Sequence, residues 1–205
     1  MHECKELEID HIDTALKTYE VFFADYARRY RAMINTFNEG LEEIRGQSLM
    51  QIQENDLEKE RKEIPDDGFS ILDDMDNVDG RLFKVCIIAT MYSETELGLK
   101  DLLGHLYDYN MTSLNIDELK NKYRETNIDL EKLKGFADFE CLRSLNNCIN
   151  HNAGTADRYI HCSCLSKIFY MGETVNLSED QIVKMAESIS RFMLDAVHAV
   201  TESLL

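Results

Sequence analysis

Apolar residues return with the period of an amphipathic helix along much of the chain. Over residues 12–44 one recurs every three or four positions, which predicts a single long helix, bent near Gly40. Residues 47–64 keep only thin apolar spacing and predict a polar helical extension that ends at Pro65. The pattern therefore predicts an N-terminal helical elaboration over residues 1–64.

The next segment, residues 65–80, is strongly acidic. Six aspartates and no basic residue fall between positions 66 and 80, and glycines stand at positions 68 and 80. Glycine and aspartate favour turns over regular helix, so this composition predicts an acidic loop.

Residues 81–205 predict a helical domain that carries one small hairpin. The hairpin is expected over residues 159–175, where β-branched, aromatic and cysteine residues surround Gly172. The helices are expected over residues 81–106, 115–134 (one or two short helices after an Asn115 or Asp117 cap), 136–152, and from the capping-box spacing at Ser178–Gln181 onward. The fold class is therefore all-α.

Composition narrows the cellular setting. The chain has 205 residues, is 44% hydrophobic, and has no run approaching the roughly 20 apolar residues that a membrane span needs. Its beginning is acidic and polar where a secretory signal would be basic and then apolar, so we expect a cytoplasmic protein without a membrane partner. Six cysteines are then expected as free thiols. Because Cys162 and Cys164 lack the spacing of zinc ligands, no metal site is expected. No cofactor is expected either.

The net charge argues against a broad nucleic-acid-binding surface but allows a small local one. The formal net charge of −17 would repel phosphate over most of the molecule. Residues 141–171, however, contain a single acid, Asp157. The same window holds five basic or titratable side chains: Arg143, Arg158, Lys167, His151 and His161.

One helical face inside this window carries candidate chemistry. Arg143, Asn147 and His151 lie four residues apart in turn, so they share a face of the predicted 136–152 helix, with Asn146 and Asn150 beside them. An arginine holds a phosphate in a bidentate way, and a histidine moves a proton near neutral pH. This set of side chains suits phosphate chemistry.

The string "LRSLNNCINHNAG" resembles the signature of the HEPN superfamily, all-α domains in which one core helix often carries "LRxxRNxxxHN". The match covers six residues: Leu142, Arg143, Asn147, His151, Asn152 and Gly154. The position that precedes Asn147 holds arginine in the family motif, but it is Asn146 here. Including the preceding apolar helix and the hairpin, the resemblance covers residues 81–205.

The resemblance implies an RNA-targeting protein of a prokaryotic defence or toxin-antitoxin system. It would be a metal-independent endoribonuclease, or a weakened version of one, with Arg143, Asn147 and His151 as its catalytic residues. Alternatively, it implies a non-catalytic HEPN-fold module that binds a nucleotide or a protein, such as an antitoxin. Whether the chain is an enzyme stays open at this point.

Two structural expectations complete this interpretation. A site that must both hold phosphate and move protons needs more than one arginine and one histidine, which favours a homodimer with a two-fold axis at the site. Glu96 falls on the apolar stripe of its helix, so its carboxylate needs a partner when buried. We expect Glu96 to contact Arg143 and to orient it, with Asn146 and Asn150 as further supporting residues.

Overall fold

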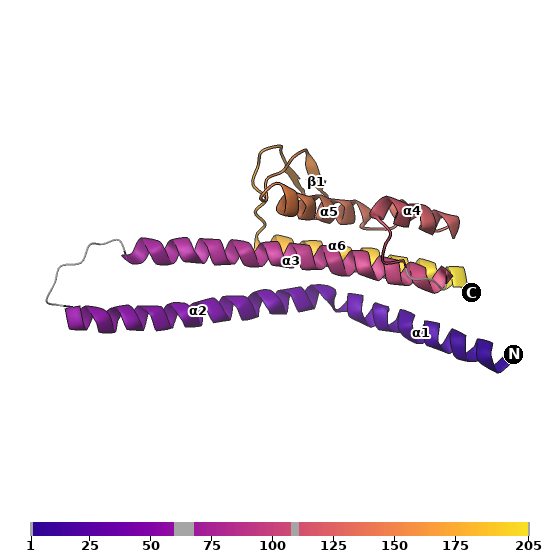
Figure 1. Ribbon diagram of the computed structural model, residues 1–205, viewed down its shortest axis with the longest axis horizontal. Coiled ribbons are helices and arrows are strands. Elements are labelled where there is room, and N and C mark those ends of the chain that lie inside the picture. Colours follow the sequence, from indigo (N-terminus) through magenta and orange to yellow (C-terminus); the bar gives the residue numbers. More distant parts are fainter. Residues whose placement is uncertain (1, 60–67, 108–110, 205) are drawn as a thin grey trace.

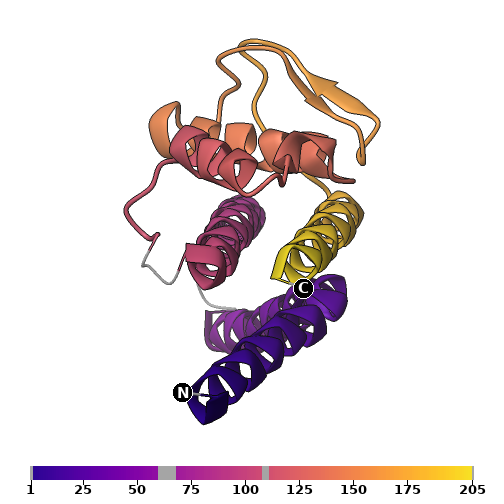
Figure 2. The same cartoon turned by 90° about the vertical axis from the view of Figure 1, so that its right-hand side faces the viewer.

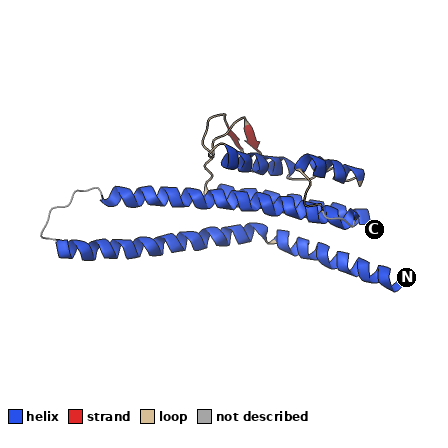
Figure 3. Ribbon diagram, in the orientation of Figure 1, coloured by secondary structure: helices blue, strands red, loops and turns tan. Residues whose placement is uncertain are grey.

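A computed structural model of the chain shows an all-α bundle with one small hairpin (Figures 1 and 3). The structure describes residues 2–59, 68–107 and 111–204. Its elements in chain order are α1 (His2–Ala24), α2 (Tyr26–Lys59), α3 (Gly68–Tyr107), α4 (Ile116–Glu125), the 3₁₀ turn η1 (Leu130–Lys132), α5 (Phe136–His151), β1 (Ile160–Cys162), β2 (Lys167–Phe169) and α6 (Glu179–Leu204). The predicted all-α class is confirmed.

The helices lie in three layers. The first layer contains α1 and α2, the middle layer α3 and α6, and the third α4 and α5, with the hairpin over α5 (Figure 2). In the hairpin β1 and β2 are antiparallel, with Ile160 opposite Phe169 and Cys162 opposite Lys167. The hairpin thus lies over the outer side of α5.

Local capping signals place two helix starts where the sequence predicted them. The Asn115 side chain accepts hydrogen bonds from the backbone N–H groups of Asp117 and Glu118, and the Glu118 carboxylate accepts one from the Asn115 N–H. Ser178 and Gln181 exchange the same pair of bonds at the start of α6. Each box satisfies backbone donors that a helix N-terminus would otherwise leave without partners.

The prediction of one helix over residues 12–44, bent at Gly40, is wrong about the position of the break. The chain leaves the helical conformation at Asp25, between α1 and α2, and Gly40 lies inside α2. The Asp25 carboxylate pairs with the Arg28 guanidinium, so a local ion pair favours a new helix start at this point. A glycine lowers helix propensity, but it does not by itself end a helix.

The acidic segment is helix and not loop. Residues 68–80 form the beginning of α3, which runs for 40 residues, whereas Asp66 and Asp67 lie outside the described residues. Ile71, Met75 and Val78 repeat at helical spacing and lead directly into the apolar stripe that follows. This periodicity is a better guide here than the density of aspartates.

Helix α6 lies at the centre of the bundle. It packs against α1, α2, α3 and α5, and twelve of its residues are buried. The Phe192 ring lies 5.2 Å from that of Phe139 in α5. Gly98 of α3 allows a close approach, because an added Cβ would lie only 3.0 Å from the Met193 side chain and 3.2 Å from Phe23. Large apolar groups around one helix supply most of the stabilising burial.

A buried carboxylate joins three parts of the third and middle layers. Asp138, in the first turn of α5, accepts hydrogen bonds of 2.6 Å from the hydroxyls of Ser163 and Ser188, and one of 2.9 Å from the Cys164 N–H. Ser163 and Cys164 belong to the hairpin turn and Ser188 to α6. Burial alone would raise the pKa of Asp138, but these donors together lower it below its ordinary value.

We predict that Asp138→Ala lowers the free energy of unfolding by about 3 kcal/mol, because two hydroxyls and a backbone N–H lose a charged acceptor. Since the folded state lowers the pKa of Asp138, its contribution is present above about pH 4 and is lost as the pH falls through the folded-state pKa. Urea denaturation at several pH values measures both effects. The difference in unfolding free energy between wild type and Asp138→Asn should therefore shrink as the pH falls from about 5 to about 2.

Asp180 provides the control, because it is an exposed aspartate in the first turn of α6. Asp180→Ala should change the unfolding free energy by less than about 1 kcal/mol. Equal losses from the two alanine variants would contradict the role given to Asp138.

Candidate functional site

Helix α5 begins after a position that only glycine occupies without strain. Gly135 has φ +84°, and a Cβ there would lie 2.7 Å from the Ser188 carbonyl oxygen of α6. The apolar side of α5, which includes Phe139, Leu142 and Leu145, is buried against the bundle. Its opposite side therefore faces outward, toward solvent and the hairpin.

The predicted polar residues are divided between the exposed side of α5 and its buried side. Asn147, Asn150 and His151 are exposed, and Arg143 is partly buried. Asn146 is buried with 7% of its surface exposed, and its Oδ1 accepts a hydrogen bond of 3.3 Å from Asn150. The residue at the position of the family's motif arginine thus supports the helix and is not presented to a ligand.

A groove of about 350 Å³ runs between α5 and β1. This α5–β1 groove is lined on one side by residues of α5 and on the other by residues of β1 and the segment before it. Its polar and aromatic lining consists of Glu140, Arg143, Ser144, Arg158, Tyr159 and His161. Two arginines, a histidine and a tyrosine thus meet in one depression.

The two guanidinium groups of the groove differ in their partners. Arg143 donates to Glu140 Oε2 through Nη2 at 2.7 Å and through Nε at 3.2 Å. Arg158 donates from Nη2 to the Ser144 hydroxyl at 3.1 Å and forms no salt bridge with any residue that the structure describes. One guanidinium is therefore already neutralised by a carboxylate, whereas the other keeps its charge available.

Glu140 is shared between two cations. Its Oε2 binds Arg143, and its Oε1 lies 3.8 Å from Lys120 Nζ of α4. The Glu140 carboxylate thus lies between a cation of α5 and a cation of α4. It also tethers Arg143 along the wall of the groove.

The predicted contact between Glu96 and Arg143 is wrong. Glu96 pairs with Lys100 one turn away in its own helix, at 2.8 Å, and about a quarter of its side chain is exposed (23%). Lys100 follows Glu96 by four residues, a spacing at which side chains of one helix pair. Tyr92 responds to both groups: burial raises its pKa, the Glu96 carboxylate adds to that shift, and Arg143 opposes it.

The structure joins only part of the predicted site. Arg143 lies in the α5–β1 groove, but Asn147 and His151 do not line it. The residues that complete the groove are Arg158, Tyr159 and His161, which helical spacing could not select because they lie beyond the end of α5. The locally positive window of residues 141–171 contains both walls of the groove and was the available signal.

The prediction that all six cysteines are free thiols is wrong, because two of them form a disulfide. Cys141 of α5 and Cys162 of β1 are bonded, with their Cα atoms 5.5 Å apart. Cys148 and Cys164 are free thiols, and burial raises the pKa of both, that of Cys164 to about 12. The side chain of Cys4 lies outside the described residues. The bond ties β1 to α5 next to Arg143.

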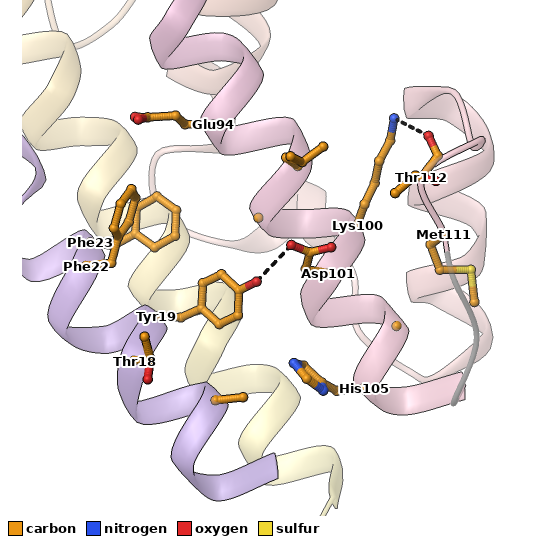
Figure 4. Close-up of a pocket in the computed structure, with 14 residues that line it drawn as sticks. Thr18, Tyr19, Phe22, Phe23, Glu94, Lys100, Asp101, His105, Met111 and Thr112 are labelled. Atoms are coloured by element: carbon orange, nitrogen blue, oxygen red, sulfur yellow. Dashed lines mark hydrogen bonds between the residues drawn. The ribbon is translucent and has the colours of Figure 1, made fainter. Parts of the chain in front are cut away.

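A second hollow, of about 750 Å³, lies between α1 and α3 (Figure 4). Its lining includes the apolar side chains of Phe22, Phe23 and Leu97. Two pairs of its polar groups bind each other: the Tyr19 hydroxyl donates to Asp101 at 3.0 Å, and Lys100 donates to the Thr112 carbonyl at 3.2 Å. Because these groups are already partnered, the hollow offers less free charge than the α5–β1 groove.

Comparisons with protein-family models, curated proteins and solved structures find no match to this chain. The HEPN resemblance, and with it the function that it implies, stays a prediction. Among the described residues, no group of three or more His, Cys, Asp or Glu side chains is placed to hold a metal ion. Within the same part of the chain, no helix is long and apolar enough to cross a membrane.

We predict that a Cys141→Ser/Cys162→Ser variant loses about 3 kcal/mol of unfolding free energy, since the bond closes a loop with a sequence separation of 21 residues. Urea denaturation with and without reductant measures the loss. When reductant is added, the unfolding free energy of wild type should fall toward that of the double variant. Alkylation under denaturing, non-reducing conditions should leave Cys141 and Cys162 unmodified, and modification of both would contradict the bond.

Proposed function

We propose that this protein is a HEPN-like RNA-targeting protein that holds an RNA phosphate in the α5–β1 groove. The observation that carries the proposal is Arg158, a guanidinium without a carboxylate partner among the described residues, in the same groove as Arg143 and His161. Arginine forks match the geometry of phosphate oxygens and form charge-assisted hydrogen bonds with them. Within a chain of net charge −17, such a site would be a local exception.

Binding without cleavage is the version that the groove supports best. The motif position before Asn147 holds the buried Asn146, and Arg143 is paired with Glu140. His151 lies on the exposed side of α5 and does not line the groove, so the groove of one chain presents no motif histidine to a phosphate. Several expectations remain predictions. They are the homodimer that would bring two copies of His151 together, the membership of a defence or toxin-antitoxin system, the antitoxin or other protein partner, and the cytoplasmic location.

We predict that Arg158→Ala weakens binding of a single-stranded RNA about tenfold at low salt, because one charge-assisted phosphate contact is lost. Fluorescence anisotropy of a labelled RNA at several salt concentrations measures the affinity. The slope of log K against log salt should also fall in magnitude by about 0.7 for the lost contact.

Arg31 is the matched control, because it is exposed on α2, in the layer farthest from the groove (Figure 2). Arg31→Ala should leave both the affinity and the salt slope unchanged. If the two variants lose affinity equally, attraction is spread over the surface and the groove is not the site. If wild type does not bind the RNA at all, the proposed function is wrong.

The same samples separate binding from cleavage. Incubation of wild type with end-labelled RNA in the absence of metal should leave the RNA intact. If wild type forms products with 2′,3′-cyclic phosphate ends and His151→Ala does not, the protein is a metal-independent endoribonuclease and not a binding module.

Glu140→Gln is predicted to strengthen RNA binding about threefold to tenfold, because it releases Arg143 from its ion pair. Glu131→Gln is the control: it also removes one negative charge, and Glu131 also pairs with an arginine, Arg124 at 2.9 Å, but outside the groove. Anisotropy titrations of both variants give the comparison. A gain of equal size in both would mean that net charge, and not Arg143, controls the affinity.

A further inference from the structure

The hairpin beside the α5–β1 groove exposes large side chains that the bundle does not cover. Tyr159 is 73% exposed and Tyr170 is 57% exposed, with Met171 and Ile168 exposed next to them. The rings of Tyr159 and Tyr170 lie 5.6 Å apart and are nearly perpendicular, at 86°. The two rings therefore form an aromatic corner in which more than half of each residue remains in solvent.

This aromatic corner adjoins the charges of the groove. Tyr159 lines the α5–β1 groove itself, directly after Arg158 in the chain, and Tyr170 contacts Tyr159 on the side of β2. A phosphate bound between Arg143 and Arg158 would thus lie beside the exposed tyrosine rings. In a nucleotide, the base follows the phosphate at the distance of one sugar.

The corner is held in place before any ligand arrives. The disulfide fixes Cys162 to α5, and Asp138 accepts hydrogen bonds from the turn between the strands. Beyond β2, the Glu173 carboxylate accepts a hydrogen bond of 3.1 Å from the Tyr170 N–H. Side chains on a fixed backbone lose less conformational entropy on binding than those on a free loop.

We propose that the Tyr159–Tyr170 corner stacks against an unpaired base of the RNA whose phosphate lies in the groove, so that the ligand class is single-stranded RNA. This inference rests on the proposed function. Bases in a duplex are stacked within the helix and do not present their faces, whereas single strands offer them to aromatic side chains. Stacking on tyrosine tolerates any base, which predicts preference for single strands without strong sequence selectivity.

The experiment compares three fluorescein-labelled RNAs of equal length by anisotropy: a mixed-sequence single strand, a blunt duplex, and an abasic strand that keeps every phosphate. Wild type should bind the single strand about tenfold more tightly than the other two. Tyr159→Ala and Tyr170→Ala should remove that preference without changing affinity for the abasic strand, and Tyr159→Phe and Tyr170→Phe should retain it. Circular dichroism confirms that each variant is folded.

Val21 gives the control for loss of an exposed apolar side chain, because it is 72% exposed on α1. Val21→Ala should bind all three RNAs like wild type. Equal binding of the single and abasic strands by wild type, with Arg158→Ala still weaker, would overturn the stacking inference and leave the proposed function standing. Failure of wild type to bind any of the three would overturn both.

Discussion

The arrangement of the outer layer depends on the ionised carboxylate of Asp138. A charged group at this depth is stable only when its hydrogen bonds replace those that water would supply. Asp138 obtains them from the hairpin turn and from α6, so the start of α5, the hairpin and the central helix have fixed relative positions. Gly135 is part of the same constraint, because it lets the chain enter α5 in contact with the Ser188 carbonyl.

Some features set by neighbouring residues could be read from the sequence, whereas features set by distant residues could not. The capping boxes at Asn115 and Ser178 involve residues three positions apart, so their spacing was sufficient. The break at Asp25 and the helical start of α3 depended on weighing an ion pair and an apolar period against glycines and aspartates. The disulfide between Cys141 and Cys162 needed the return of β1 along α5, which composition does not contain.

In the candidate site, some short-range features were predicted and others were missed. Helical spacing placed Asn147 and His151 on a face that is exposed, and the distribution of charge identified the positive window. The same spacing also allows Arg143 to bind Glu140 three residues earlier and Glu96 to bind Lys100 four residues later, and neither pair was predicted. Both are short-range ion pairs, and each removed a partner from the longer-range contact that burial alone suggested. The second wall of the groove came from a hairpin whose position depends on tertiary packing.

The ion pair between Glu140 and Arg143 also sets what an incoming anion must achieve. The groove already contains an acceptor for Arg143, and that acceptor is attached to the same helix, so it is always present at high local concentration. An isolated carboxylate or chloride gains little by exchanging with it. An anion that spans Arg158 and Arg143 at once does not need to displace Glu140 completely, because its charge is shared between two cations. In the proposed function, the resident carboxylate would therefore make the groove discriminate by the reach and number of an anion's oxygens, and not by negative charge alone.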